Sequence, residues 1–290
     1  LNDPLKGWGS PLTVARPAEF PTDFTDPRLK WGDMSGDALQ DAVSIHGGNV
    51  TYFPNLGYGK WGNAVLMSGI LDLPADYNPK RLLLGDIDGD GLADLVYVDS
   101  GTITIWINKN GNAWSSPITI NDAPVITDSD DVRLSDLHGT GLSSLLYSKD
   151  FTGLGSNLSL LRFQHSVKPY LLTAMDNHIG AVTKIHYESS VQFYLKDQAD
   201  STTAWRTVLP FPVQVVSRVE VIDELSRGKK TTQYQYHDGY WDGVDREFRG
   251  FGMVEQYDSE SFDEYDRSGL HGNGVSFSKV PVNQFSSPTL

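Results

Sequence analysis

The residues whose types and spacing best suit chemistry are four aspartates in one short stretch. Asp86, Asp88, Asp90 and Asp94 occupy positions 1, 3, 5 and 9 of a glycine-containing segment. Ca²⁺ takes about six to eight oxygen ligands, and alternate residues of a tight turn can converge on it, with a backbone carbonyl near Leu92. The spacing therefore predicts a structural calcium site, in which the ion offsets the mutual repulsion of the carboxylates.

Two other interpretations apply to the same stretch. An EF-hand would need Glu at position 12, which is Tyr97, and helices on both sides, whereas the sequence continues as apolar β-type residues. The aspartates could instead cap a turn through hydrogen bonds to backbone N–H groups, with no metal. Since the site has no open coordination position for chemistry in either case, its expected role is structural.

Related loops occur before and after this one. The earlier loop offers fewer charges, and we consider it a second candidate calcium site, formed by Asp33, Ser35, Asp37 and Asp41. The later loop begins at Asp136 but has His138, Thr140 and Ser144 where the central loop has aspartates. We expect the later loop to keep the turn and to bind no metal.

The loops belong to a repeat of 53 residues. Its frame is set by tryptophans 53 residues apart, each preceded six residues earlier by an asparagine: Trp8, Trp61 and Trp114, with Asn2, Asn55 and Asn108. A unit of about 50 residues with several short strands has the size of one β-propeller blade, and propellers close with typically 4 to 8 blades. Because the chain opens in the middle of a repeat, we expect a fragment of a longer propeller.

The composition favours a mostly β, globular protein. Apolar residues make up 39% and charged residues 21%, and Gly, Pro and aromatic residues are frequent. A net charge of −14 argues against binding to nucleic acid or to an anionic membrane surface. The absence of cysteine excludes disulfides, thiolate metal sites and cysteine nucleophiles. No run approaches the roughly 20 apolar residues that span a bilayer, and residues 1–8 lack the layout of a signal peptide.

Motifs for catalysis are not convincing. Residues 57–62 match the G-x-G-x-x-G pattern of dinucleotide sites, but no helix is predicted to follow, and the repeat explains the glycines as a turn between strands. The sequence contains neither H-E-x-x-H nor G-x-S-x-G. We therefore expect a protein that is not an enzyme, and an active site in a propeller channel remains the least favoured hypothesis.

From about Pro169 the repeat gives way to different β-rich sequence. Strands are predicted over residues 181–187, 213–222 and 230–236, separated by Gly, Pro and Asp turns. The stretch over residues 234–252 is dense in aromatic residues, glycines and opposite charges. It suits strands joined by tight turns, with Arg246 or Arg249 pairing with nearby carboxylates.

At this point the sequence resembles a known family. The stretches 236–240 (YHDGY) and 247–255 (EFRGFGMVE), with the loop 85–91 (GDIDGDG), are similar to the B component of bacterial Tc insecticidal toxin complexes and to the related virulence protein SpvB. The resemblance implies an all-β fold with two parts. Residues 1–165 would be FG-GAP-type propeller blades, and residues 166–290 would enter an Rhs-like shell of antiparallel strands.

The resemblance also implies a function without catalysis. In that family a C component completes the shell around a cytotoxic polypeptide, and the propeller docks onto a channel-forming A component and gates release. The protein would then be secreted. An alternative of another class is a calcium-dependent adhesin or lectin that binds host protein or glycan, with tryptophans stacking on sugar. An adhesin propeller would have no reason to continue into the EFRGFG strand, so the second half favours the toxin component.

Overall fold

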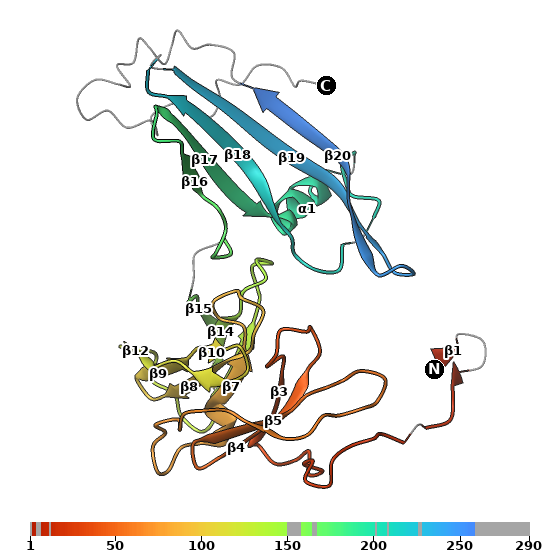
Figure 1. Cartoon of the computed structure of the whole chain (residues 1–290), viewed down its shortest axis with the longest axis vertical. Coiled ribbons are helices and arrows are strands. Elements are labelled where there is room, and N and C mark those ends of the chain that lie inside the picture. Colours follow the sequence, from red (N-terminus) through yellow and green to blue (C-terminus); the bar gives the residue numbers. More distant parts are fainter. Residues whose placement is uncertain are drawn as a thin grey trace. The chain divides into compact units, whose positions relative to one another are not determined.

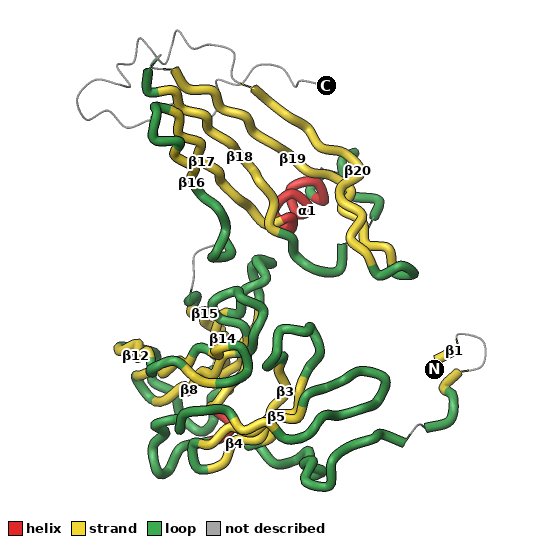
Figure 2. The backbone as a smooth tube through the Cα atoms, viewed as in Figure 1, coloured by secondary structure: helices red, strands yellow, loops and turns green. Residues whose placement is uncertain are grey.

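The computed structural model describes residues 2–3, 7–11, 13–149, 158–163, 167–200, 202–207, 209–225 and 228–258. The described secondary structure is almost entirely antiparallel strands, which confirms the predicted all-β class (Figure 2). The chain divides into two compact units. The first unit contains Leu1–Ser135 and Leu142–Phe163, and the second contains Asp136–Gly141 and Gln164–Leu290.

The first unit contains three consecutive antiparallel sheets, most of whose strands are labelled in Figure 1. The first sheet has four strands in chain order: β3 (Leu29–Gly32), β4 (Asp41–His46), β5 (Asn49–Phe53) and β6 (Val65–Leu66). The second follows a 3-10 turn, η1 (Pro79–Arg81), and repeats this order: β7 (Leu82–Gly85), β8 (Asp94–Asp99), β9 (Thr102–Trp106) and β12 (Ile118–Asn121). The third has three strands: β13 (Asp131–Ser135), β14 (Ser144–Ser148) and β15 (Leu158–Leu161).

The asparagine and tryptophan of each repeat pair across a small hairpin. Asn2 pairs with Trp8 between β1 (Asn2–Asp3) and β2 (Gly7–Trp8), and Asn108 pairs with Trp114 between β10 (Asn108–Lys109) and β11 (Ala113–Trp114). An isolated antiparallel bridge joins Asn55 and Trp61 in the same way. The glycine-rich segment between those two residues is a tight turn, in which the N–H of Lys60 donates to the carbonyl of Gly57 at 3.0 Å. The turn interpretation of that segment is confirmed.

Successive sheets of the first unit share cores built from equivalent positions. In the first sheet one set of residues faces the second sheet: Val43, Ile45, Val50 and Tyr52. The residues 53 positions later face the third sheet: Val96, Val98, Ile103 and Ile105. The alternation predicted for residues 102–107 is thus correct, because Ile103 and Ile105 are both buried in the second core.

The opposite faces of the sheets are also equivalent. In the second sheet, residues of this face pack on the first sheet: Leu82, Leu95, Trp106 and Trp114. Their equivalents 53 residues earlier form a small cluster with Phe20: Leu29, Ala42, Phe53 and Trp61. The second sheet therefore has one face on the sheet before it and one on the sheet after it, and the first sheet carries the equivalent residues on both faces. The recurring tryptophans at 61 and 114 are packing residues.

The second unit is dominated by a sheet of five antiparallel strands in chain order. These are β16 (Ala174–Asp176), β17 (Ala181–Ser189), β18 (Gln214–Asp223), β19 (Gly228–Asp242) and β20 (Glu247–Asp258). The three strands predicted here are present; β17 and β19 are longer than expected, and β18 has the expected length shifted by one residue. A β-bulge in β18 opposite His186 and Tyr187 keeps Ser217, Glu220 and Ile222 buried along one strand.

One α-helix lies among the described residues, and the sequence analysis did not predict it. Helix α1 (Ser190–Gln198) follows β17 directly and packs against β17 and β19 (Figure 1). Ser189 caps its N-terminus, since the Ser189 side chain accepts a hydrogen bond from the N–H of Val191. The Oγ of Ser189 also donates to the carbonyl of Gly139, so the loop 136–141 is attached to α1 within the second unit.

Candidate functional site

The three aspartate loops occupy the same place in their sheets. Each begins directly after the first strand of a sheet and ends at the first residue of the next strand. Position 9 of each loop pairs with the residue just before position 1: Asp41 with Gly32, Asp94 with Gly85, and Ser144 with Ser135. The antiparallel pairing of the two strands therefore closes each loop.

The aspartate at position 1 organises its loop by accepting hydrogen bonds from backbone N–H groups. The carboxylate of Asp86 accepts from Gly89 at 2.6 Å and from Gly91 at 3.0 Å. Asp33 accepts from Gly36 and Ala38, each at 2.7 Å. Asp136 accepts from Thr140 at 3.0 Å and Gly141 at 2.6 Å, although its loop has lost the other aspartates. These bonds are the capping contacts expected for Asp in turns, and they are common to all three loops.

The aspartate at position 9 has a different role, which the sequence analysis did not recognise. Asp94 is completely buried, and its two carboxylate oxygens accept from the N–H groups of Ile87 at 2.9 Å and Asn108 at 2.8 Å. Asp41, also completely buried, accepts from Met34 at 3.0 Å and Asn55 at 2.8 Å. Position 9 thus ties the start of its loop to the hairpin that begins 14 residues later.

Burial makes the charged form of these two carboxylates costly. It raises the pKa of Asp94 to about 7, because desolvation outweighs the hydrogen bonds from Asn108 and Ile87, and Asp88 and Asp90 add repulsion. The pKa of Asp41 is also raised by burial, partly offset by the same kind of hydrogen bonds. A cation beside Asp94 would favour its ionised form.

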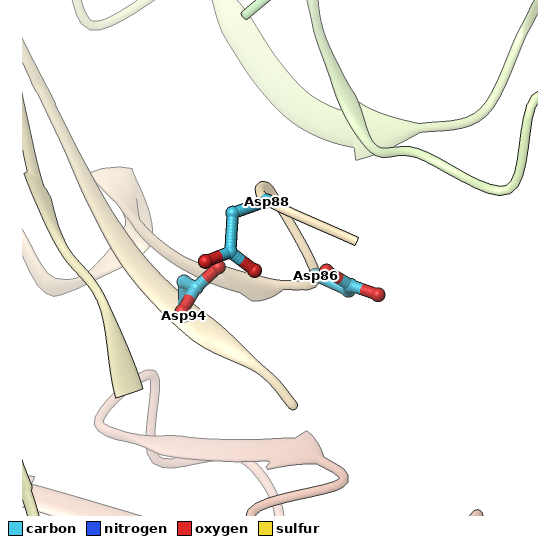
Figure 3. A group of neighbouring side chains, drawn as sticks. All are labelled: Asp86, Asp88 and Asp94. Atoms are coloured by element: carbon cyan, nitrogen blue, oxygen red, sulfur yellow. The ribbon is translucent and has the colours of Figure 1, made fainter. Parts of the chain in front are cut away.

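The central loop brings three carboxylates together. One oxygen each of Asp86, Asp88 and Asp94 lie within 4.8 Å of one another, and Figure 3 shows the carboxylates of Asp88 and Asp94 facing each other. This is the one group of three or more acidic or histidine ligands with such spacing among the described residues. The donor set is hard oxygen, which fits Ca²⁺. The oxygens of Asp86 and Asp94 already accept backbone hydrogen bonds and would have to share their remaining lone pairs with an ion.

The other predicted ligands are placed differently. The carboxylate of Asp90 accepts from the N–H of Leu92 at 2.8 Å and lies outside the group of three. In the earlier loop, Asp37 accepts from the N–H of Leu39 at 2.9 Å, and the N–H of Ser35 donates to Asp33 at 3.2 Å. The described residues of that loop form no group of three close carboxylates.

Consecutive loops are joined directly. The N–H of Ala93 in the central loop donates to the carbonyl of Asp33 at 2.6 Å, and the N–H of Ser143 donates to the carbonyl of Asp86 at 3.0 Å. These contacts need a close approach of the backbones. A Cβ on Gly32 would lie 2.9 Å from the Cβ of Ala93, and a Cβ on Gly85 would lie 2.9 Å from Leu134. The residue before position 1 is therefore glycine wherever another repeat follows.

In the second unit, three consecutive residues of β19 hold the segment that begins with α1. His237 Nδ1 lies 2.6 Å from an oxygen of Asp197, in the last turn of α1. Asp238, in a left-handed backbone conformation, accepts from the backbone N–H of Arg206 at 2.7 Å and from its guanidinium at 2.8 Å. Gly239 leaves room for the ring of Trp205, which a Cβ would approach to 2.8 Å. Residues 237–239 of β19 thus attach the segment that begins with α1 to the sheet.

The arginines of the neighbouring turn behave partly as expected. Arg249 pairs with Asp245 at 2.7 Å and with Glu247 at 3.0 Å, which confirms the predicted pairing for one of the two candidates. These pairs are largely exposed, so their contribution to stability is at most about 1 kcal/mol each.

Among the described residues no helix is long and apolar enough to cross a membrane.

Comparison with known proteins identifies the family. The family model described as the insecticide toxin TcdB middle/N-terminal region matches residues 108–268, more than half of the chain. That range includes the last asparagine–tryptophan hairpin and the whole sheet of the second unit. No curated protein matches the chain.

Solved structures give the same result. The chain is similar to a crystal structure of TcdB2–TccC3 with Cdc42, at 33% identity and a TM-score of 0.74, covering 82% of this chain and 11% of that chain. TcdB2–TccC3 without its hypervariable C-terminal region matches at 32% identity and a TM-score of 0.76, covering 86% and 12%. The Tc holotoxin pore of Photorhabdus luminescens matches at 33% identity and a TM-score of 0.74, covering 83% and 11%.

The chain thus spans only about an eighth or less of the length of these solved chains. The stretches that carried the resemblance, residues 236–240 and 247–255, lie within the matched range. The chain belongs to the family of the TcdB middle/N-terminal region, a part of the B component of Tc insecticidal toxins.

Proposed function

We propose that this chain is a non-catalytic structural part of a secreted toxin complex. Its first unit would belong to a propeller that docks onto a channel-forming A component and gates it. Its second unit would belong to a shell that a C component completes around a cytotoxic polypeptide. The observation that carries this proposal is the match of residues 108–268 to the TcdB middle/N-terminal region, together with the likeness to TcdB2–TccC3 and to a holotoxin pore.

The packing of the first unit supports the propeller. The second sheet presents one face to the first sheet and the other to the third, as a blade in a ring does. The face of the first sheet that corresponds to an inter-sheet face is covered by Phe20, and Trp31 on this side remains about half-exposed. Another repeat of a longer protein would bury this surface in the way that the first sheet buries Leu82 and Leu95.

The long strands of the second unit support its proposed place in the wall of the shell. Its strands are up to 15 residues long and pair in antiparallel register. The strand β20, at the edge of the sheet, presents unpaired backbone groups along its outer side among the described residues. A further strand of the complete protein would pair there and extend the wall.

A calcium ion in the central loop is part of the proposal. Asp86, Asp88 and Asp94 would bind it, with a backbone carbonyl near Leu92 and Asp90 on the exposed side. The group of three close carboxylates supports this site, whereas the earlier loop, with Asp33, Ser35, Asp37 and Asp41, has no such group in the described structure. The ion would stiffen the turn between β7 and β8 and would take no part in chemistry.

The separate roles proposed for the two units can be tested with a matched pair of substitutions in the full-length protein that contains this chain. Leu95→Asp places a charge in the core shared by the first two sheets, and Ile222→Asp does so in the second unit; both residues are buried. We expect Leu95→Asp to abolish binding to the A component while co-purification with the C component persists. We expect Ile222→Asp to have the reverse effect.

Electron microscopy of the purified complexes would show whether the shell or the channel component is lost. Leu95→Ala and Ile222→Ala are less disruptive substitutions at the same two positions. A closed shell seated on a channel in the wild-type complex is the expected result. A propeller with neither shell nor channel component, or A-component binding that survives the loss of the first unit, would contradict the proposal.

A further inference from the structure

The tip of the hairpin 108–114 is packed tightly on the repeat before it. Gly111, at this tip, is buried and has a left-handed backbone conformation, with a φ of 70°. A Cβ on Gly111 would lie 2.8 Å from the hydroxyl oxygen of Tyr52 and 2.9 Å from the carbonyl oxygen of Met34. Asn108 holds the tip there, since its Nδ2 donates to the same carbonyl of Met34 at 3.1 Å. The first repeat thus supplies an aromatic ring to this contact, and the second repeat supplies a glycine.

The equivalent position of the earlier hairpin, 53 residues before Gly111, is Tyr58. Tyr58 also has a left-handed conformation, with a φ of 50°, but its side chain is fully exposed. A bulky residue with positive φ is strained, and an exposed ring buries no apolar surface that would offset this strain. Glycines at positions 57 and 59 flank Tyr58, so the tip is built for glycine and yet carries an aromatic ring at its centre.

Both hairpins are attached in the same way to a segment that precedes them. Ser68 forms a parallel bridge with Ala113 of the later hairpin, and Ala15, 53 residues before Ser68, forms a parallel bridge with Lys60 of the earlier hairpin. The earlier hairpin is therefore held as the later one is, and its tip points to the place where a preceding repeat would present its counterpart of Tyr52.

The two tips cannot use the same kind of contact surface. In the contact of Gly111, the hydroxyl of Tyr52 occupies the space that a side chain at the tip would need. A tyrosine at the tip fits only a neighbour whose side chain at the position of Tyr52 is small. An exchange of large and small residues across a contact conserves the packed volume and disfavours the wrong pairing of surfaces.

We propose that Tyr58 is an interface anchor. In a longer protein that contains this chain, its ring fills a pocket on the repeat that precedes the first sheet, where a small residue occupies the position equivalent to Tyr52. The exchange fixes the order of the repeats, because a glycine tip would leave this pocket empty and a tyrosine tip would collide with Tyr52. The inference rests on the propeller part of the proposed function and names the residue through which the first sheet meets its neighbour.

Cysteine labelling in the full-length protein tests whether position 58 is covered. This chain contains no cysteine, so Tyr58→Cys and the control Asp122→Cys each add one thiol to it, with any cysteines elsewhere replaced by serine. Asp122 is exposed and has a similar φ of 60°. We expect a maleimide to label position 58 at least about tenfold more slowly than position 122, with equal rates in urea. Equal rates in the folded protein would overturn the proposal.

The sign of a stability change gives a second test. Glycine at an exposed position with positive φ relieves the backbone, so stability stays the same or rises. Removal of a ring from a filled pocket leaves a cavity instead. We expect Tyr58→Gly to speed proteolysis of the first unit in the full-length protein about tenfold. Tyr58→Phe, which keeps the ring, and the control Asp122→Gly should stay within about twofold of the wild type. A Tyr58→Gly variant as resistant as the wild type would contradict the anchor.

Binding to the A component, measured on the same proteins, separates this inference from the proposed function. Protection of position 58 in a full-length protein that binds no A component would support the anchor and overturn the proposed docking role. Rapid labelling of position 58 in a protein that does bind the A component would overturn the anchor alone.

Discussion

The backbone N–H of Asn108 donates a hydrogen bond of 2.8 Å to the buried carboxylate of Asp94, and Asn55 makes the same bond to Asp41. In the third repeat both partners are replaced, since Ser144 occupies the aspartate position and Leu158 lies 14 residues after it. The aspartate and the asparagine are therefore kept or lost together. The asparagine side chain adds a further bond, because Nδ2 of Asn108 donates to the carbonyl of Ala93 and Nδ2 of Asn55 donates to the equivalent carbonyl of Gln40, each at 3.2 Å.

Asp94→Asn should destabilise the first unit by about 1–3 kcal/mol. The amide keeps one acceptor oxygen but points an NH₂ group at a backbone N–H, so one of the two buried amides loses its partner. Urea unfolding in the presence of a chelator measures the change without any contribution from metal. The control is Asp76→Asn at an exposed position, which should change stability by less than about 0.5 kcal/mol. Equal effects of the two substitutions would contradict the assigned role.

Calcium should stabilise the chain against heat, and chelation should reverse the effect. Binding to the folded state alone adds about 3 kcal/mol when calcium is at roughly a hundred times its dissociation constant. Asp88→Asn should abolish the calcium-dependent shift in melting temperature and leave the melting temperature in chelator nearly unchanged. A melt that calcium does not alter in the wild type would remove the metal site but would leave the hydrogen-bonding roles of Asp86 and Asp94 intact.

Gly32→Ala should destabilise the first unit by about 1–3 kcal/mol through overpacking. The added methyl group would lie 2.9 Å from the Cβ of Ala93 in the next repeat, and the backbone there has no flexible side chain to move aside. Gly243→Ala, where nothing lies within 4 Å, is the matched control and should be close to neutral. Chemical denaturation of both variants distinguishes the two results, and a neutral Gly32→Ala would show that the loops can separate.

Lys30 should make stability rise with pH above neutrality. Its Nζ donates to the carbonyl of Pro79 at 2.8 Å, and burial lowers its pKa to about 8, partly offset by Asp26. The unfolded chain then binds the Lys30 proton more tightly than the folded chain, so stability increases between about pH 8 and pH 10. Lys30→Met should remove this increase and stabilise the protein at pH 7. The exposed Lys80→Met should do neither when unfolding is followed across the same pH range.

Features that depend on local pattern were predictable from the sequence. The alternation at residues 102–107, the turn glycines and the fixed spacing of the tryptophans correctly indicated short antiparallel strands in a repeated arrangement. The aromatic stretch near residue 240 correctly indicated the family. Each of these signals lies within one strand, one turn or one repeat, where neighbouring residues determine the conformation.

The remaining features depend on partners far apart in the chain. Asp197 and His237 are 40 residues apart, and nothing in either local sequence indicates the other. The helix α1 was missed because its residues 191–195 mix β-branched, aromatic and apolar types without a clear stripe; Ser189 before it was the available signal. At position 9 of the loops an aspartate can either bind a metal ion or accept hydrogen bonds from buried backbone N–H groups. Spacing alone therefore could not distinguish the two roles.

The hydrogen bonds that join consecutive loops, from Ala93 to Asp33 and from Ser143 to Asp86, connect each repeat only with its immediate neighbours. The free energy of such an array is a sum of repeat terms and nearest-neighbour coupling terms, as in a one-dimensional lattice. Damage to one repeat then weakens the coupling on its two sides and fades beyond them. In a closed ring every repeat has two neighbours, whereas an open row frays from its ends, so ring closure would convert graded unfolding into a single cooperative transition.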